Sequence, residues 1–394
     1  MSESKKILIF ASGYPPHIKG GGEISTKLLA NGLSAIGNKV KVLACSDKEG
    51  VRIDDDGKTE IHEIFPPNIY WNFGGKRNFA ARLIWHLIES LNFSFNKNIH
   101  NLIESFRPDV IVTSTIENFG SKIWQAASFY EIPVVHVLRS YYLKCYKGTM
   151  FSEGKICKKE CSVCSCLTYR RRKDASLVSG VVGVSRFILD KHSSLFLNSK
   201  LTYIYNPVVI DQRYRKCIPA SGPVFGYLGR IEEEKGIQDL LDGAICVSPE
   251  AKIIIAGGGD EKYISFLKNK YFGTNVEFVG WIDPGNIYER INYLLCPSKW
   301  DEPFGRVVVE ANSYGIPVIA SMRGGLTEIV HEGINGFLFD WDDPNSVRDV
   351  FCKVKNSDYM YESMSENSLR LSREFSVEVS AKKYSLFIDE VLSR

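Results

Sequence analysis

The sequence predicts an α/β protein with two domains, each built around a parallel β-sheet. The chain has 394 residues, which is too long for one compact core of ordinary size. Apolar runs of strand length alternate with segments of helical spacing and with polar, glycine-containing loops, as in strand–helix–strand units of a parallel sheet. A hydrophobic content of 44% and a charged content of 24% are those of a globular protein.

The clearest of these units lies between Leu294 and Ile329. We expect a buried strand at residues 294–296, a helix at 306–314 and the next strand at 317–320. Ligands of open parallel sheets bind outside the carboxyl ends of the strands. The residues at those ends are Glu302, Phe304, Gly305, Gly324 and Gly325.

These residue types suit a ligand that carries both phosphate and hydroxyl groups. Gly324 and Gly325, followed by a helix expected from about Thr327, would expose N–H groups that a phosphate can approach without meeting a side chain. Carboxylates accept hydrogen bonds from hydroxyls, so Glu302 and Glu310 are expected to bind sugar hydroxyls. A nucleotide linked to a sugar combines both features.

Three sequence elements resemble those of the family 4 retaining glycosyltransferases. Glu302-Pro303-Phe304-Gly305 with Glu310 is similar to the E-x7-E element, and Gly229-Arg230 with Lys235-Gly236 and Gly324-Gly325 with Glu328 are similar to two more. The likeness is specific over residues 200–394 and looser before them. It implies the GT-B fold, which has two Rossmann-like doubly wound domains facing a central cleft and a C-terminal helix that crosses back to the first domain.

The resemblance also implies a role for each site residue. Arg230, Lys235 and the helix start after Gly325 would stabilise the departing diphosphate, so that catalysis requires no metal. Glu302 would bind sugar hydroxyls and Glu310 the ribose. Phe304 and Gly305 would present main-chain N–H groups, and Trp281 would flank the base. Packing of Trp281 and a surface salt bridge from the cations to residues 232–234 are the alternatives.

The expected domains are residues 1–206 on the acceptor side, 207–375 for the nucleotide sugar, and a helix at 376–394 that packs on the first domain. The glycine loop with Gly21 and Gly22 is expected from the resemblance to help bind the donor, with a flexible turn as the alternative. His136 is expected in the core. Arg139 stands where many relatives carry a histidine, and we expect it to hold an acidic acceptor or the charge of the leaving group.

A cysteine-rich insert is expected at about residues 145–166. Cys157, Cys161, Cys164 and Cys166 have the density of a structural zinc site, although the spacing is irregular and free thiols are the alternative. Any such zinc would be architectural and would take no part in catalysis.

Membrane and nucleic-acid partners are constrained by charge and hydropathy. A net charge of +3 gives no argument for nucleic acid. No segment has the apolar length of a membrane span, and the first residues lead directly into a strand, so a cytoplasmic protein is expected. An amphipathic helix at 79–106, an aromatic loop at 69–73 and the basic run at 170–173 would allow peripheral contact with the inner face of a membrane. Ordinary packing and a solvated helix face are the alternatives.

The expected reaction is transfer of a sugar, with retention, from a nucleoside-diphosphate sugar to a hydroxyl of a saccharide or lipid-linked saccharide. Relatives suggest a role in cell-surface polysaccharide biosynthesis. A nucleotide-sugar epimerase of similar fold and a non-catalytic nucleotide-sugar-binding protein are the competing interpretations.

Overall fold

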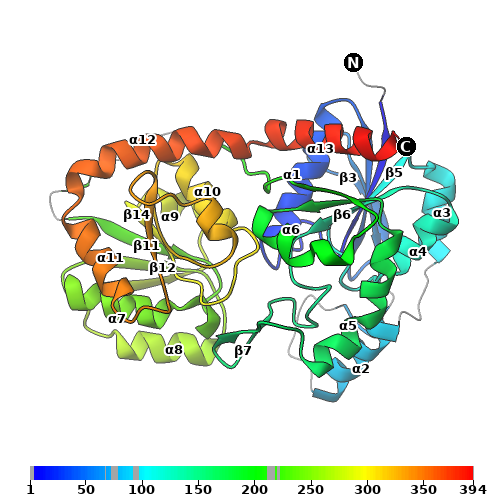
Figure 1. Cartoon of the computed structure of the whole chain (residues 1–394). Coiled ribbons are helices and arrows are strands. Elements are labelled where there is room, and N and C mark those ends of the chain that lie inside the picture. The colour runs from blue at the N-terminus through cyan, green and yellow to red at the C-terminus, as the bar shows by residue number, and fades with distance from the viewer. Residues whose placement is uncertain are drawn as a thin grey trace. The chain divides into compact units, whose positions relative to one another are not determined.

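The computed structural model of the protein describes residues 4–66, 68–71, 79–91, 97–210, 218–219 and 222–393. The chain forms two compact units. Unit 1 contains residues 1–150, 158–207 and 377–394, and unit 2 contains residues 151–157 and 208–376. Each unit is an α/β layer structure with helices around a central sheet (Figure 1).

Unit 1 is built on an eight-stranded sheet in the order β10-β9-β6-β5-β1-β2-β4-β3. All neighbouring strands are parallel except β3 and β4. The central strands are continuous buried apolar runs, as expected where both faces of a parallel sheet are covered. The strands are β1 (Lys6–Ala11), β2 (Lys39–Cys45), β3 (Gly50–Ile53), β4 (Glu60–Ile64), β5 (Val110–Thr113), β6 (Val134–Leu138), β9 (Gly180–Gly183) and β10 (Lys200–Tyr203).

The helices of unit 1 include the last helix of the chain, α13, which packs beside α1 (Figure 1). Gly32 of α1 lets the two helices approach closely, because a Cβ there would lie 2.9 Å from Val377 Cγ1. The α-helices are α1 (Gly21–Ala35), α2 (Phe79–Leu91), α3 (Lys97–Phe106), α4 (Lys122–Phe129), α5 (Ser162–Asp174), α6 (Arg186–His192) and α13 (Val377–Leu392). Short 3-10 turns η1 (Ala175–Leu177) and η2 (Ser193–Leu195) follow α5 and α6.

Unit 2 is built on a six-stranded parallel sheet in the order β13-β12-β11-β14-β15-β16. From β11 the chain adds strands first on one side and then, from β14, on the other, which is the doubly wound arrangement. The strands are β11 (Val224–Leu228), β12 (Lys252–Ala256), β13 (Val276–Gly280), β14 (Tyr293–Cys296), β15 (Val318–Ser321) and β16 (Gly336–Phe339). Residues 151–157 contribute a hairpin of β7 (Phe151–Ser152) and β8 (Lys155–Ile156).

Helices cover both faces of the unit 2 sheet, with α7 and α8 on one face and α9, α10 and α12 on the other (Figure 1). The α-helices are α7 (Ile237–Val247), α8 (Glu261–Lys270), α9 (Pro284–Tyr288), α10 (Arg306–Ser313), α11 (Ser346–Lys355) and α12 (Tyr361–Ser372). The 3-10 turns are η3 (Glu233–Lys235), η4 (Gly325–Glu328), η5 (Asp358–Met360) and η6 (Arg373–Phe375). None of the helices in the described ranges has both the length and the apolar character needed to cross a membrane.

The predicted α/β fold with two parallel-sheet domains is confirmed. Two local expectations were wrong. The helix expected at 79–106 is two helices, α2 and α3, and residues 92–96 between them lie outside the described residues. The helix expected from Thr327 is only the short 3-10 turn η4. Asn72 and Phe73 of the expected aromatic loop also lie outside the described residues.

Candidate functional site

The candidate site of unit 2 lies where its sheet reverses strand order, at the neighbouring strands β11 and β14. The loop after β11 carries Arg230 and Lys235, and the loop after β14 carries Glu302. Because the carboxyl ends of both strands meet at one edge of the sheet, these loops are neighbours although they are far apart in sequence.

Lys235 and Glu302 form the central ion pair of this edge. Lys235 Nζ donates to Glu302 Oε1 over 2.6 Å, and the two side chains are only 15% and 13% exposed. The ammonium group also lies 5.1 Å from the centroid of the Trp300 ring. Ser298 Oγ donates to the same carboxylate oxygen. The cation is therefore held in place by a carboxylate and an aromatic face, and it is largely shielded from solvent.

Arg230 lies on the same loop but is more exposed than Lys235. Its guanidinium Nη1 donates to Glu232 Oε1 over 2.9 Å, and its side chain is 46% exposed. An exposed ion pair of this kind contributes little to stability, so the guanidinium can exchange Glu232 for an anionic ligand at small cost. The Arg230 carbonyl accepts a hydrogen bond from Tyr227 Oη over 2.6 Å, which fixes the start of the loop.

Glu310 is fixed from two sides on helix α10. Arg306 Nε donates to its Oε1 over 2.6 Å, and Tyr288 Oη donates to its Oε2 over 3.1 Å. The helix begins after Gly305, whose φ of +105° is favoured only by glycine. Burial is the main cause that raises the pKa of Tyr288 well above its usual value, and the adjacent carboxylate adds to it. The phenol therefore stays protonated and acts as a hydrogen-bond donor to Glu310.

Gly324 and Gly325 allow two loops to touch. A Cβ on Gly324 would lie 2.3 Å from the Glu302 carbonyl oxygen, and one on Gly325 would lie 2.7 Å from the Pro303 carbonyl oxygen. The Gly325 amide donates to the Glu302 carbonyl over 2.7 Å. The expectation that this amide is exposed to a phosphate was therefore wrong, because it joins the two loops instead. This contact sets the position of Glu302.

Trp281 and Phe304 have different environments. Trp281 follows β13 and is one of the most exposed aromatic side chains, and its indole lies against Gly258, where a Cβ would be 2.5 Å from Nε1. Such an exposed ring at a strand end is available to stack on a flat ligand. Phe304 is buried and its ring centroid lies 5.9 Å from that of Phe375, so this side chain anchors the loop.

In unit 1, Arg139 lies at the carboxyl edge of the sheet, directly after β6. Its Nε donates to Ser114 Oγ over 2.8 Å, and its Nη1 donates to the side-chain oxygen of Asn206. The next residue, Ser140, donates from Oγ to Glu117 Oε1 over 3.2 Å. Burial raises the pKa of Glu117. The edge therefore carries a fixed cation beside a carboxyl group that is partly removed from water.

Gly21 and Gly22 form the first turn of α1 in unit 1. The preceding Gly20 amide donates to Glu23 Oε2 over 3.0 Å, and a Cβ on Gly22 would meet nothing within 4 Å. Gly22 therefore leaves open space in the first turn of the helix, where anions and hydroxyl oxygens are favoured.

His136 is a core residue, as predicted. It is buried, its Nδ1 is 2.9 Å from Thr113 Oγ1, and its ring packs edge-to-face on Trp124 with 5.0 Å between centroids. Burial lowers its pKa to about 3, so the ring is neutral at ordinary pH.

The expected zinc set of four cysteines is not assembled. Cys161 precedes α5 and accepts the Cys164 amide on its sulfur, while Cys164 is buried next to the thiols of Cys161 and Cys145. Cys166 is exposed, because residues two apart on a helix point to different sides. Within the described residues, no group of three or more His, Cys, Asp or Glu side chains has an arrangement suited to a metal. The prediction of zinc at Cys157, Cys161, Cys164 and Cys166 is therefore not supported.

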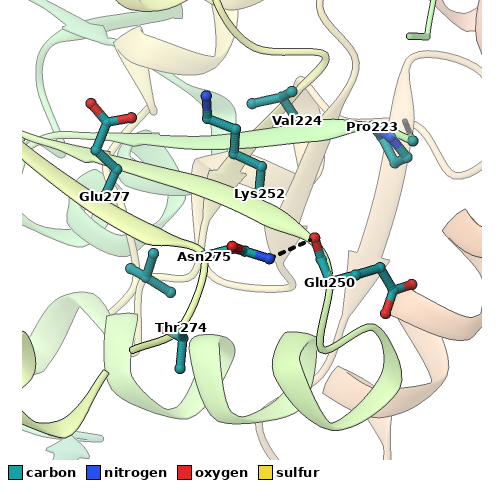
Figure 2. Close-up of a pocket in the computed structure, with 9 residues that line it drawn as sticks. Pro223, Val224, Glu250, Lys252, Thr274, Asn275 and Glu277 are labelled. Carbon is teal, nitrogen blue, oxygen red and sulfur yellow. Dashed lines mark hydrogen bonds between the residues drawn. The ribbon is translucent and has the colours of Figure 1, made fainter. Parts of the chain in front are cut away.

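A cavity of about 540 Å³ lies at the opposite, amino-terminal edge of the unit 2 sheet, where β11, β12 and β13 begin (Figure 2). Lys252 and Glu277 stand on its strands, and Asn275 Nδ2 donates to the Glu250 carbonyl over 3.1 Å. Its polar groups are of mixed charge and lie away from the carboxyl strand ends. It therefore lacks the convergent cations of a diphosphate site.

Three residues that support the site were not found from the sequence: Ser298, Tyr288 and Trp300. Each contacts a predicted residue through the fold rather than through a motif. Arg306 could have been found, because it lies four residues before Glu310 on a predicted helix, where opposite charges pair.

Comparisons with known proteins agree with this geometry. A family model described as glycosyltransferase family 4 matches residues 19–212, and one described as glycosyl transferases group 1 matches residues 211–370. An uncharacterized 42.6 kDa protein in the cps region of Klebsiella pneumoniae is 29% identical over 370 residues, which are 90% of this chain and 97% of that protein. D-inositol 3-phosphate glycosyltransferase of Corynebacterium urealyticum is 28% identical over 190 residues, which are 42% of each chain.

Solved structures share the fold across the whole chain. Sucrose-phosphate synthase from Thermosynechococcus elongatus has a TM-score of 0.80 at 19% identity, with 99% of each chain covered. Anabaena HepE, solved in complex with UDP and glucose, has a TM-score of 0.69 at 18% identity and covers 98% of this chain and 99% of its own. These likenesses show that the protein has the GT-B fold. The two family models, which together match residues 19–370, identify it as a group 1, family 4 glycosyltransferase.

Proposed function

We propose that the protein transfers a sugar, with retention of anomeric configuration, from a nucleoside-diphosphate sugar to a hydroxyl of a saccharide or lipid-linked saccharide. The observation that carries this proposal is the set of Lys235, Glu302 and Glu310 around one strand-order reversal. The likeness to the cps-region protein supports a role in cell-surface polysaccharide biosynthesis. We place the reaction in the cytoplasm, at the inner face of the membrane.

In the proposed reaction the bond between the anomeric carbon and the diphosphate oxygen breaks, and its electron pair stays on the diphosphate. The acceptor oxygen bonds to the anomeric carbon, and the acceptor proton passes to a diphosphate oxygen. Lys235 and Arg230 stabilise the extra negative charge on the leaving group, so no divalent metal is needed. Lys235 reaches the phosphate by exchanging part of its contact with Glu302.

The remaining residues bind and orient the donor. Glu302 accepts hydrogen bonds from sugar hydroxyls once Lys235 turns to the phosphate, and Glu310, oriented by Arg306 and Tyr288, accepts those of the ribose. Trp281 stacks on the base. Phe304 and Gly305 present main-chain N–H groups at the start of α10, and Gly325 keeps the Glu302 loop in place.

In unit 1, we assign Arg139, Gly21 and Gly22 to the same reaction. Arg139 is anchored by Ser114 and Asn206, so it offers a fixed positive charge to an acidic acceptor or to the leaving group. The open first turn of α1 receives oxygen atoms of the donor.

A two-step experiment tests the proposal. First, thermal shift with UDP-, GDP- and ADP-sugars identifies the donor, because a ligand of the native state raises its melting temperature. Second, the best donor is incubated with alkyl glycosides in the presence of EDTA, and the products are analysed by NMR for transfer and anomeric configuration. We expect a glycoside with the anomeric configuration of the donor sugar. Conversion of the donor without an acceptor would indicate an epimerase, and binding without any turnover would indicate a non-catalytic protein.

A further inference from the structure

Helix α5 of unit 1 (Figure 1) begins with a cysteine at its N-cap. The Cys161 side chain accepts a hydrogen bond from the Cys164 amide, with 3.5 Å between Sγ and N. Serine, threonine, aspartate and asparagine are the residues that ordinarily cap a helix in this way. Capping alone therefore does not explain a cysteine at this position, because serine would cap the helix at least as well.

The first turn of α5 brings a second thiol to Cys161. The Cys164 thiol donates a hydrogen bond to Cys161 Sγ and lies beside the thiol of Cys145. Cys161 is exposed, whereas Cys164 is only 7% exposed. The turn is fixed by hydrogen bonds of 2.8 Å from the Ser165 amide to the Cys161 carbonyl and from Thr168 Oγ1 to the Cys164 carbonyl. A solvent-accessible sulfur therefore lies next to a buried one at a rigid helix start.

The two thiols differ in acidity. The hydrogen bond from the Cys164 amide, followed by that from its thiol, lowers the pKa of Cys161. This is the effect expected at a helix N-terminus, where N–H groups and the helix dipole favour a thiolate. Burial raises the pKa of the Cys164 thiol. Cys161 is thus suited to attack, and Cys164 keeps its proton until it reacts.

We propose that Cys161 and Cys164 form a redox-active dithiol that exchanges with small disulfides such as oxidised glutathione. The Cys161 thiolate attacks one sulfur of oxidised glutathione, so that a mixed disulfide forms and one glutathione thiolate leaves. The Cys164 sulfur then attacks Cys161 Sγ, the mixed disulfide breaks, and the second glutathione leaves with the proton of Cys164. The two cysteines lose two electrons, and oxidised glutathione becomes two molecules of glutathione, the first of which takes its proton from water.

The pairing of Cys161 with Cys164 follows from access to solvent. Cys145 is 4% exposed, so a dissolved disulfide reaches Cys161 first, and the mixed disulfide that Cys164 resolves forms there. Cys166 is exposed, but it lies two residues beyond Cys164 on α5 and points to a different side. The bond would be reversible, as disulfides of cytoplasmic proteins usually are. This inference does not depend on the transferase roles proposed above.

Peptide mapping of the full chain after incubation with oxidised glutathione tests the proposal. Trypsin releases residues 160–170, which contain Cys161, Cys164 and Cys166, and fragmentation of this peptide locates the bond. We expect the loss of two hydrogen atoms, with Cys161 joined to Cys164, and full reversal by dithiothreitol. In the reduced chain, iodoacetamide should alkylate Cys161 at least about fivefold faster than the exposed Cys166 and Cys246.

Serine variants separate the two steps, and circular dichroism verifies that each variant is folded. Cys164→Ser should accumulate the glutathione adduct of Cys161, because the resolving thiol is missing. Cys161→Ser, in which serine still caps the helix, should form no disulfide in this peptide. Cys166→Ser is the matched control and should form the disulfide at the unchanged rate.

Three results would overturn the proposal. The first is a disulfide that joins Cys164 to Cys145 or Cys166 in place of Cys161. The second is a glutathione adduct that persists on Cys161 of the unchanged protein, because Cys164 would then not reach it. The third is alkylation of Cys161 no faster than that of Cys246, because the helix start would then not activate the thiol.

Discussion

Replacement of Lys235 by alanine tests the proposed electrostatic role most simply. The variant removes a cation that is 15% exposed and lies 2.6 Å from Glu302. If this cation stabilises the departing diphosphate, its loss should lower kcat about 10²- to 10³-fold, the usual effect of removing one group that stabilises transition-state charge. Loss of a partly buried ion pair should also lower the free energy of unfolding by about 1–3 kcal/mol.

The chain offers a matched control at Lys270. Its ammonium lies 2.6 Å from Asp242 and 5.4 Å from the Tyr271 ring centroid, much as Lys235 contacts Glu302 and Trp300. It lies in the last turn of α8, away from the carboxyl strand ends. Lys270→Ala should therefore leave kcat and nucleotide affinity unchanged.

The assay combines calorimetry with product formation. The Kd of the nucleoside diphosphate and kcat for the identified donor are measured for both variants and for the unchanged protein. Urea unfolding gives the stability of each, so a folding defect is separated from a catalytic one. A kcat for Lys235→Ala within a few-fold of the unchanged protein, or an equal loss in Lys270→Ala, would refute the reasoning.

Three further predictions follow from the site and the core. Glu310→Gln should weaken binding of the nucleoside and of the nucleoside diphosphate equally, by about tenfold, because the carboxylate that contacts the ribose loses its charge. Calorimetry with both ligands checks this, and weaker binding of the diphosphate alone would contradict it. Gly325→Ala should destabilise the protein by about 1–3 kcal/mol, because its Cβ would lie 2.7 Å from the Pro303 carbonyl, whereas Gly22→Ala, with open space around it, should not lower the melting temperature. Burial lowers the pKa of His136 to about 3, so as the pH drops below about 6.5 the unfolded chain takes up a proton that the folded protein does not. The free energy of unfolding should therefore fall, by about 3 kcal/mol near pH 4. His136→Gln should reduce this pH dependence of the unfolding free energy in urea titrations, and an unchanged dependence would show that the folded ring does charge.

Much of the fold was predictable because buried parallel strands are continuous apolar runs. β6 and β14 are recognisable in sequence for this reason. The ion pair of Lys235 with Glu302, 67 residues away, was not predicted, since the salt bridge considered for the cations was to residues 232–234. It becomes expected only once the strand order is known. Residues after β11 and β14 must meet if the two strands flank a strand-order reversal.

Hydrogen-bond partners of loops were not predictable in the same way. The Gly325 amide was expected to be exposed, yet it donates to the Glu302 carbonyl. Two glycines in sequence signal a close approach of something to the backbone, but they do not say whether it is a ligand or another loop. The structure answers this question, because it shows that the loop carrying Glu302 lies against the two glycines.

The cysteine insert shows a second limit. Four cysteines within ten residues suggested a metal site. Once the segment is helical, however, the spacing between two cysteines decides whether their thiols point to the same side of the helix. Cys164 and Cys166 lie two residues apart on α5 and point to different sides, while Cys145, farther away in sequence, is near Cys164. The neighbours of a thiol thus depended on where α5 begins, which the irregular spacing did not reveal.

The most direct test of the account is a crystal structure of the full chain with the nucleoside diphosphate that gives the largest thermal shift. We predict density at the carboxyl ends of β11 and β14, with the diphosphate against Arg230 and Lys235 and the ribose hydroxyls on Glu310. Density in the cavity at the amino ends of β11, β12 and β13, or a nucleotide that contacts neither cation, would contradict the account.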